Sequence, residues 1–170
     1  MNNKEIEIWD LYDKNRNKLL KKVKRGAFLE DNEYHLVINA WIKNSKNEFL
    51  ITRRSANKKY AFMWECTGGS ALKGESSLQA AIREVKEELG ITVDKNKSVL
   101  IGTTLRHFKG CPDIFDVWLF FGDYPIESIT IQQEEVCDVM WADVETIKKL
   151  YEENKFEANA FFEEVLNYVY

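Results

Sequence analysis

The sequence has little of the residues that break a chain into separate parts. Only two prolines and eight glycines occur in 170 residues, and the chain contains no repeat, low-complexity tract or proline-rich linker. This composition argues against a multi-domain or fibrous protein. Hydrophobic residues make up 45% of the chain, which is enough for a sizeable core. We therefore expect residues 1–170 to form a single domain.

Cysteines and long apolar runs are also scarce. The three cysteines, Cys66, Cys111 and Cys137, lack zinc-ligand spacing and leave an odd count, so neither a zinc site nor a disulfide framework is expected. The longest apolar run, residues 117–121, is too short to cross a bilayer, and the first residues are polar. These features predict a cytoplasmic protein with no membrane contact.

The overall charge of the chain is negative. The net charge is -4 and no long basic run occurs, so general nucleic-acid binding is not expected. An acidic protein that acts on an anionic substrate would need cations between the two. The question is then whether the chain contains a group of residues able to hold such cations.

Residues 69–91 contain that group. Glu84, Glu87 and Glu88 occupy positions i, i+3 and i+4 of a predicted helix, so the three carboxylates share one face. Like charges placed in this way repel one another. A bound divalent cation would remove the repulsion, because hard oxygen ligands suit Mg²⁺, with Mn²⁺ as the alternative. The competing interpretation is a solvated acidic helix face.

The surrounding residues predict where this helix begins and ends. Ser76 and Gln79 form a capping-box pattern, and Gly90 is suited to a left-handed residue after the last turn. We interpret Glu75 and Arg83 as a structural ion pair, which requires the preceding loop to fold back onto the helix. An apolar stripe lies beside the carboxylate face and should pack on the core; it consists of Leu78, Ala81, Ile82, Val85 and Leu89.

This segment is similar to a known motif, the Nudix box. Every specified position of that motif is present: Gly69, Glu75, Arg83, Glu84, Val85, Glu87, Glu88, Gly90 and Ile91. The resemblance implies a Nudix fold of the α/β class, a mixed sheet sandwiched between helices. It also implies magnesium-assisted hydrolysis of a diphosphate linkage in a nucleoside diphosphate derivative or related compound. Glu84, Glu87 and Glu88 would be the metal ligands.

Such a reaction also needs a general base, which in this family often lies outside the motif. Glu135 is the best candidate, and Glu134 is its neighbouring alternative. Glu87 of the motif is a further catalytic candidate. The competing interpretation of Glu134 and Glu135 is an ordinary acidic loop. Gly68 and Gly69 belong to a glycine-rich stretch whose backbone can pass close to a substrate.

The N-terminal half resembles a particular branch of the Nudix family, which includes isopentenyl-diphosphate isomerase. Arg54 and Lys58 match residues that contact the diphosphate in that branch, and their charges suit this role. Gly68 and Ser70, however, stand where the isomerase would have a cysteine and a histidine. We therefore expect a hydrolase, with an isomerase-like enzyme or a non-catalytic nucleotide-binding module as alternatives. His35 is interpreted as structural and is left out of the metal set.

Hydrophobic patterning predicts the remaining elements. Alternation before the turn at residues 13–17 predicts an N-terminal hairpin beginning at residue 5, and residues 36–42 and 49–53 predict a second hairpin. Further strands are expected at residues 99–107, 114–122 and 136–141, and helices at residues 144–153 and 157–168. The substrate is expected to be a small-molecule diphosphate, and a homodimer remains an open alternative to a monomer.

Overall fold

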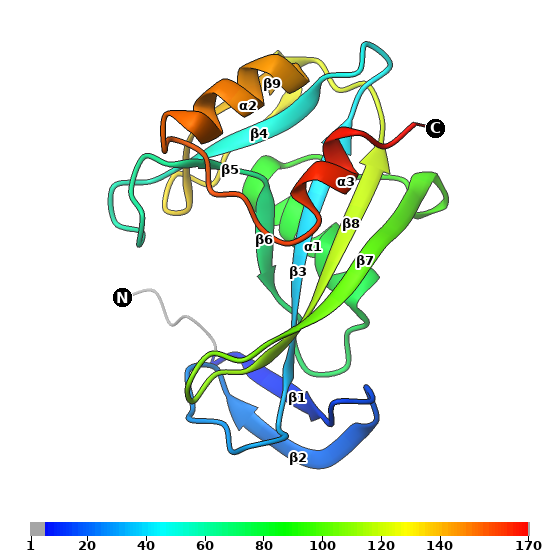
Figure 1. Cartoon of the computed structure of the whole chain (residues 1–170), viewed down its shortest axis with the longest axis vertical. Coiled ribbons are helices and arrows are strands. Elements are labelled where there is room, and N and C mark those ends of the chain that lie inside the picture. Colours follow the sequence, from blue (N-terminus) through cyan, green and yellow to red (C-terminus); the bar gives the residue numbers. More distant parts are fainter. Residues whose placement is uncertain (1–5, 170) are drawn as a thin grey trace.

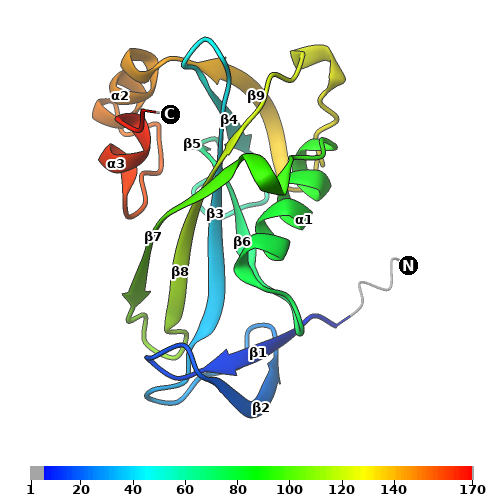
Figure 2. The same cartoon turned by 90° about the vertical axis from the view of Figure 1, so that its right-hand side faces the viewer.

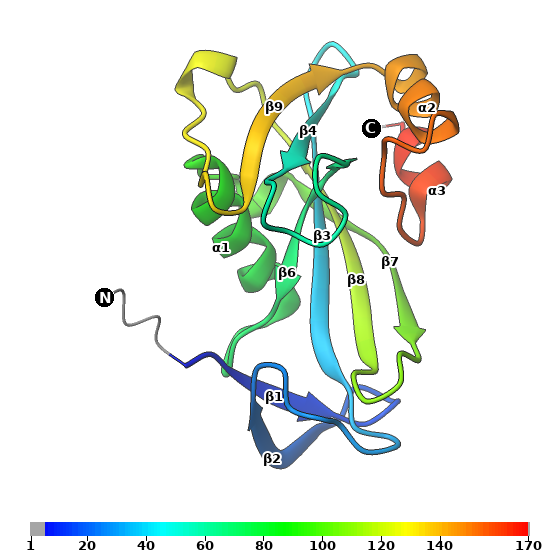
Figure 3. The same cartoon turned by 90° about the vertical axis from the view of Figure 1, so that its left-hand side faces the viewer.

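The structure is a computed structural model that describes residues 6–169. Helix α1 (Ser77–Leu89) covers one face of a twisted sheet, and α2 (Val144–Glu152) and α3 (Phe162–Leu166) cover the other. Figures 2 and 3 show these layers from opposite sides, with a separate β-hairpin at one end. The expected α/β architecture, a mixed sheet between helices, is confirmed.

In the described part, the sheet has seven strands, with β5-β4-β3-β8-β7 in order and two further strands attached. Strand β6 pairs with β3 and β9 pairs with β4. Only the central β3–β8 pair is parallel, which makes the sheet mixed. The strands are β3 (His35–Lys43), β4 (Phe49–Arg54), β5 (Trp64–Glu65), β6 (Thr67–Ser70), β7 (Ser98–Arg106), β8 (Asp113–Phe121) and β9 (Val136–Ala142).

The central strand β3 is buried on both faces. Alternate side chains of a strand point to opposite sides, so Leu36, Ile38 and Ile42 pack with α1, whereas Trp41 packs with α2 and α3. Figure 1 shows β3 and β8 running side by side through the middle of the molecule. This two-sided burial fixes the strand that forms the floor of the site described below.

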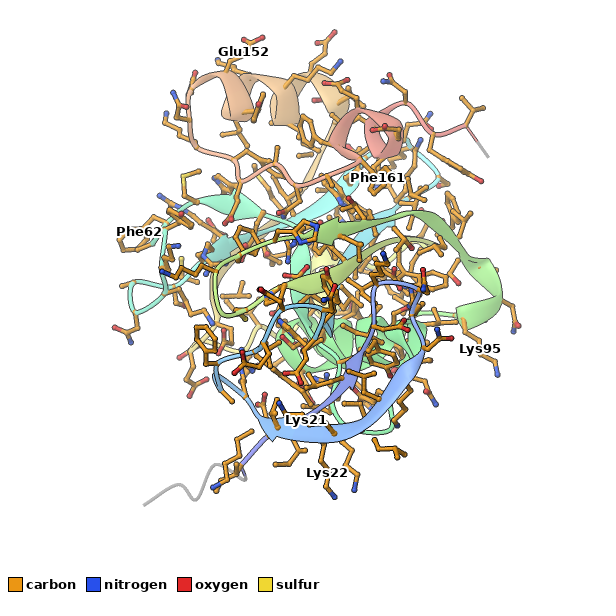
Figure 4. All side chains as sticks on the ribbon, turned by 60° about the horizontal axis from the view of Figure 1, so that its bottom comes forward. Lys21, Lys22, Phe62, Lys95, Glu152 and Phe161 are labelled. Carbon is orange, nitrogen blue, oxygen red and sulfur yellow. The ribbon has the colours of Figure 1, made fainter. Side chains whose placement is uncertain are left out.

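The N-terminal hairpin forms a two-stranded sheet of its own, β1 (Ile8–Tyr12) and β2 (Lys18–Lys24). In Figure 4, Lys21 and Lys22 project outward from β2. Asp10 of β1 accepts a hydrogen bond from the backbone N–H of Gly74, and the N–H of Lys73 donates to the carbonyl of Ile8. The hairpin therefore fixes the loop that precedes α1. Residue 5, where the hairpin was expected to begin, lies outside the described residues.

Most predicted elements are present within one or two residues of their expected limits. The capping box is formed as predicted, since Ser76 accepts from the N–H of Gln79 and the Gln79 side chain accepts from the N–H of Ser76. Gly90 has φ of 69°, the left-handed conformation expected after the last turn. Two short strands, β5 and β6, were not predicted. Glycine-rich β6 forms because its backbone pairs with β3.

The predicted helix over residues 157–168 is wrong in its first half. Residues 157–161 are not helical, and only α3 forms. The N–H of Glu157 instead donates to the carbonyl of Trp64, next to a β-bridge between Trp64 and Phe156. Phe161 has φ of 64° and its ring packs over Gly102 of β7; Figure 4 shows it beneath α3. The apolar spacing of residues 157–168 predicted a helix, but in the structure the chain at Phe156 and Glu157 pairs with Trp64 of β5.

The helices of residues 6–169 are short or polar. None of them combines the length and the apolar character that a membrane-spanning helix needs.

Candidate active site

Helix α1 presents its carboxylates to strand β6. Ala80, Ala81, Val85 and Leu89 are fully buried against the sheet and fix the rotation of the helix. Figure 3 shows α1 lying along β6. Glu84, on the adjoining face, lies so close to Gly69 that a Cβ atom at Gly69 would be 2.1 Å from its Oε1 atom. A glycine is therefore required there for the carboxylate to rest on the β6 backbone.

Two carboxylates of the motif are partly buried near each other. Burial raises the pKa of Glu84 to about 7, although Arg83 opposes the shift. Burial also raises the pKa of Glu88 well above its usual value, and the charges of Glu84 and Glu65 raise it further. The chain thus places acidic groups where their negative charge is unfavourable. Such an arrangement is typical of a site that holds a cation.

Glu87 lies on the solvent side of this pair. Its side chain is 51% exposed, and its Oε2 atom is 3.0 Å from Nη1 of Arg83. Among residues 6–169, no three His, Cys, Asp or Glu side chains are grouped closely enough to form a ready-made metal site. The structure therefore brings together Glu84 and Glu88 of the predicted metal set, while Glu87 stands beside them.

The chemistry of the acidic residues nevertheless fits a hard divalent cation. Glu84 and Glu88 supply partly buried carboxylates whose mutual repulsion a cation would remove, and Gly69 leaves room beside Glu84. Oxygen donors of this kind are what Mg²⁺ and Mn²⁺ prefer. Glu84 and Glu88 thus offer the kind of oxygen donors that such a cation would need.

Arg83 connects the helix to the loop before it. Its Nε and Nη2 atoms donate to the two carboxylate oxygens of Glu75, at 2.7 and 3.0 Å, and Nη2 also donates to the carbonyl of Ser70. Nη1 donates to Glu84 and Glu87, each at 3.0 Å. The expected ion pair between Glu75 and Arg83 is present. Arg83 is thus a brace that also contacts two carboxylates of the predicted metal set.

Glu135 approaches the site from the turn before β9. Its carboxylate forms an ion pair with Lys58, and its charge contributes to the raised pKa of Glu88. Glu134 is exposed, and its side chain has no hydrogen bond or ion pair within residues 6–169. Of the two predicted bases, only Glu135 therefore faces the carboxylates of α1.

Arg54 ends β4 and points toward an acidic residue that the sequence analysis missed. Its Nη1 atom is 2.6 Å from Oε2 of Glu65, and its Nε atom donates to the carbonyl of Lys59 at 2.7 Å. Burial raises the pKa of Glu65, and Arg54 opposes that shift. One signal was available in the sequence, since Glu65 is a lone charge in an apolar stretch, residues 61–66.

A cleft of about 330 Å³ lies next to this site; Arg54, Glu65 and Gly69 line it, whereas Glu84, Glu88 and Glu135 do not. Three of the predicted substrate-binding residues, Arg54, Gly68 and Gly69, line it, and Lys58 stands beside Glu135. The aromatic residue Phe115 of β8 also lines the cleft. The remaining lining residues are Val37, Ile38, Asn39, Lys59, Tyr60, Cys66, Ser70, Arg106, Glu157 and Asn159.

His35 lies outside this cleft. Its ring is buried and stacks on Trp9, with 3.9 Å between centroids, and its Nε2 atom is 3.4 Å from Sγ of Cys111. Its Nδ1 atom has no hydrogen-bond partner among the described residues. Burial lowers the pKa of His35 to about 4, and the charges of Arg106 and Arg25 lower it further. His35 is therefore neutral at pH 7.

A pH titration of stability checks this description. Between pH 6.5 and pH 4 the unfolded chain protonates the His35 side chain, whereas folded His35 stays neutral, so stability is lost as the pH falls. We expect His35→Phe, which keeps the stacked ring, to lose less of its free energy of unfolding over this range than the wild type, by up to about 3 kcal/mol. Urea unfolding at pH 7.0 and 4.5 measures the difference. An equal loss in both proteins would contradict a buried neutral histidine.

Comparison of the sequence with known proteins identifies relatives that share this motif-bearing domain. The family model of the NUDIX domain matches residues 33–163. An uncharacterized Nudix hydrolase of Listeria innocua is 39% identical over 156 residues, covering 89% of this chain and 88% of that protein. Isopentenyl-diphosphate Delta-isomerase of Escherichia coli is 29% identical over 129 residues, covering 73% of this chain and 70% of the isomerase.

The fold has solved counterparts. A crystal structure of a Deinococcus radiodurans protein superimposes with a TM-score of 0.70 over 94% of this chain and 97% of that chain, at 18% sequence identity. This likeness concerns the fold, whereas the family model and the Listeria relative concern the sequence itself. The expected kinship is therefore confirmed, including the weaker similarity to the isomerase branch: the chain belongs to the Nudix hydrolase family of pyrophosphohydrolases.

Proposed function

We propose that this chain is a Mg²⁺-dependent hydrolase that cleaves the diphosphate linkage of a nucleoside diphosphate derivative or related small molecule. The observation that supports it most directly is the partly buried pair Glu84 and Glu88, with Glu84 against Gly69 and with Glu65 and Glu135 near Glu88. These last two carboxylates form ion pairs with the cations Arg54 and Lys58. Mn²⁺ would satisfy the same oxygen ligands. A domain of residues 1–170 in the reducing cytoplasm, where its three free cysteines stay reduced, completes the proposal.

The proposed roles divide between the carboxylates of α1 and the cations that follow β4. Glu84, Glu87 and Glu88 are the proposed metal ligands, with Glu87 able to join from the solvent side. When bound, the metal would neutralise phosphate oxygens and lower the pKa of a water molecule. Arg54 and Lys58 would bind the diphosphate, and the backbone of Gly68 and Gly69 would allow its close approach.

Glu135 is the proposed general base. In the free protein it is paired with Lys58. Phosphate oxygens would compete for the Lys58 ammonium group, which leaves the Glu135 carboxylate to accept a proton from the attacking water. The water oxygen then bonds to phosphorus as the bridging P–O bond breaks, and the second phosphate leaves with the bridging oxygen. Glu75 and Arg83 take no part in this step and hold the loop and helix together.

The adjacent carboxylates Glu135 and Glu134 offer a matched test. We expect Glu135→Gln to lower kcat by about 10²- to 10⁴-fold, because it removes the proton acceptor, and Glu134→Gln to leave kcat nearly unchanged. Release of phosphate and of pyrophosphate from a panel of diphosphates, with and without Mg²⁺, measures both variants. A loss confined to Glu134→Gln would transfer the role to that residue. No turnover of any diphosphate by the wild type would favour a nucleotide-binding module.

The similarity to the isomerase justifies one further assay. Gly68 and Ser70 stand where that enzyme is expected to have a cysteine and a histidine, and both line the cleft without supplying those groups. Incubation with isopentenyl diphosphate and Mg²⁺ should therefore give no allylic isomer. Formation of the allylic product would overturn the assignment as a hydrolase.

A further inference from the structure

Two chain segments outside the Nudix motif form the mouth of the cleft. One is the loop of residues 55–63 between β4 and β5, which supplies Lys59 and Tyr60. The other is the non-helical stretch before α3, which supplies Glu157 and Asn159. Figure 1 shows the first segment extending beyond the ends of β4 and β5. These residues lie outside the motif and are not among the groups proposed to bind the diphosphate or the metal.

Tyr60 has a backbone conformation that its side chain disfavours. Its φ is 56°, and that of Phe62 in the same loop is 65°. Glycine or asparagine would adopt this left-handed conformation at a lower cost in free energy. Strained backbone of this kind persists where the surrounding structure enforces it, and it often marks a functional site. The choice of a large aromatic residue therefore needs an explanation other than backbone preference.

Packing in the core does not provide that explanation. The Tyr60 side chain is 54% exposed, and Lys59 Nζ lies 4.7 Å from its ring centroid. Phe62 is also half-exposed, but its ring contacts the Arg53 guanidinium, and Figure 4 shows it at the outer edge of the molecule. Only Tyr60 of these two aromatic residues lines the cleft. Its ring is thus available to a ligand.

The loop that holds Tyr60 is fixed by two arginines. Arg54 Nε donates to the carbonyl of Lys59 at 2.7 Å, and Arg53 Nε donates to that of Phe62 at 3.1 Å. The N–H of Phe62 donates in turn to the carbonyl of Arg54 at 3.0 Å. A ring held in place before binding loses little conformational entropy when a ligand stacks on it. The loop is therefore built to present the ring rather than to move.

Asn159 lines the same cleft with a polar group. Its partly buried amide makes no hydrogen bond within residues 6–169, so one acceptor and two donor positions remain for a ligand. The neighbouring Glu157 is anchored, since its N–H donates to the carbonyl of Trp64 at 2.8 Å. An apolar prenyl chain would remove this amide from water without a partner, which is unfavourable. A heterocycle with a polar edge would satisfy it.

We propose that Tyr60 and Asn159 form a subsite for a planar heterocyclic base attached to the diphosphate. Tyr60 stacks on the face of the ring, and Asn159 forms hydrogen bonds to its edge. This inference rests on the proposed hydrolase function and specifies its substrate class: a nucleoside diphosphate derivative is preferred over a prenyl diphosphate. Both residues determine specificity and neither takes part in the chemical step.

Equilibrium binding of uncleavable ligands tests the subsite without turnover. The probes are the α,β-methylene diphosphates of adenosine, guanosine, cytidine and uridine, with methylenebisphosphonate as the probe that lacks a base. We expect Tyr60→Asn to raise the Kd of the best nucleoside probe about tenfold or more, as loss of stacking does elsewhere. Tyr60→Phe should bind almost as the wild type. Asn159→Ala should change the order of preference among the four bases.

Two further readouts separate the outcomes. Tyr60→Asn should raise the Tm, because asparagine tolerates the left-handed backbone, and methylenebisphosphonate should bind equally to all variants. Unchanged nucleoside binding by Tyr60→Asn, or an equal loss for methylenebisphosphonate, would overturn the subsite. If base-dependent binding is found but no diphosphate is hydrolysed, the hydrolase function fails and the subsite stands. If Tyr60→Asn hydrolyses diphosphates as the wild type does and binds nucleosides unchanged, the subsite fails and the hydrolase function stands.

Discussion

Glu88→Gln should abolish most activity and yet leave the metal-free protein at least as stable as the wild type. We expect kcat to fall by about 10²- to 10³-fold, because a site that stabilises charge in the transition state loses one of its ligands. The substitution keeps the size and shape of the side chain. Phosphate release at saturating Mg²⁺ and a thermal melt in EDTA measure the two effects.

The expected gain in stability follows from the surroundings of Glu88. Burial disfavours the charged form of this side chain, and Glu84 and Glu65 disfavour it further. A neutral amide avoids both costs, although the hydrogen bond with Thr67 must be kept. If Glu88 had been selected for stability alone, the substitution would instead lower the free energy of unfolding. A charged residue that lowers stability at this position is explained if its carboxylate is needed to bind a metal.

Mg²⁺ provides the decisive comparison for this variant. A ligand that binds only the folded state raises the Tm in proportion to RT ln(1 + [L]/Kd). We expect Mg²⁺ to raise the Tm of the wild type and of the control Lys86→Gln, an exposed residue on the same helix, but to have a much smaller effect on Glu88→Gln. A full Mg²⁺ shift in Glu88→Gln, with activity retained, would remove Glu88 from the ligand set.

Helix α1 could be predicted well from the sequence because its signals are local. The capping box of Ser76, the left-handed Gly90 and the apolar stripe act within four residues of the positions they affect. The Glu75–Arg83 pair also spans only one loop and one helix. Each of these contacts is formed by residues that are close in the sequence, so the residue types and their spacing were sufficient to predict it.

The parts of the site that escaped prediction depend on contacts between distant segments. Glu65 faces Glu88 because a two-residue strand pairs with β4, and so short a strand has no periodicity to detect. Phe156 and Glu157 pair with Trp64, and the residues that follow are not helical, so that Asn159 lines the cleft. The backbone conformation of Tyr60 is equally hidden, since nothing in its residue type suggests a positive φ.

Arg83→Ala should cause the largest loss of stability among the variants considered. The guanidinium group donates to Glu75, Ser70, Glu84 and Glu87, and its removal leaves partly buried carboxylates without their partner. Breaking such a pair costs about 3 kcal/mol, which corresponds to roughly 6–12 °C in Tm for a chain of this size. Thermal melts measure this shift. Arg83→Lys, which keeps the charge but loses the two-pronged contact with Glu75, should lie in between.

The effect of Arg83→Ala on metal binding shows whether Arg83 only joins the loop to the helix or also orients the metal ligands. Nη1 of Arg83 lies 3.0 Å from Oε1 of Glu84, so in the free protein the guanidinium occupies a carboxylate that the metal is proposed to use. Removing it takes away a competing positive charge. The Mg²⁺ affinity of Arg83→Ala, measured by calorimetry well below its Tm, should therefore equal or exceed that of the wild type. If the affinity falls about as steeply as in Glu84→Gln, Arg83 orients the ligands as well, and its role extends beyond the pair with Glu75.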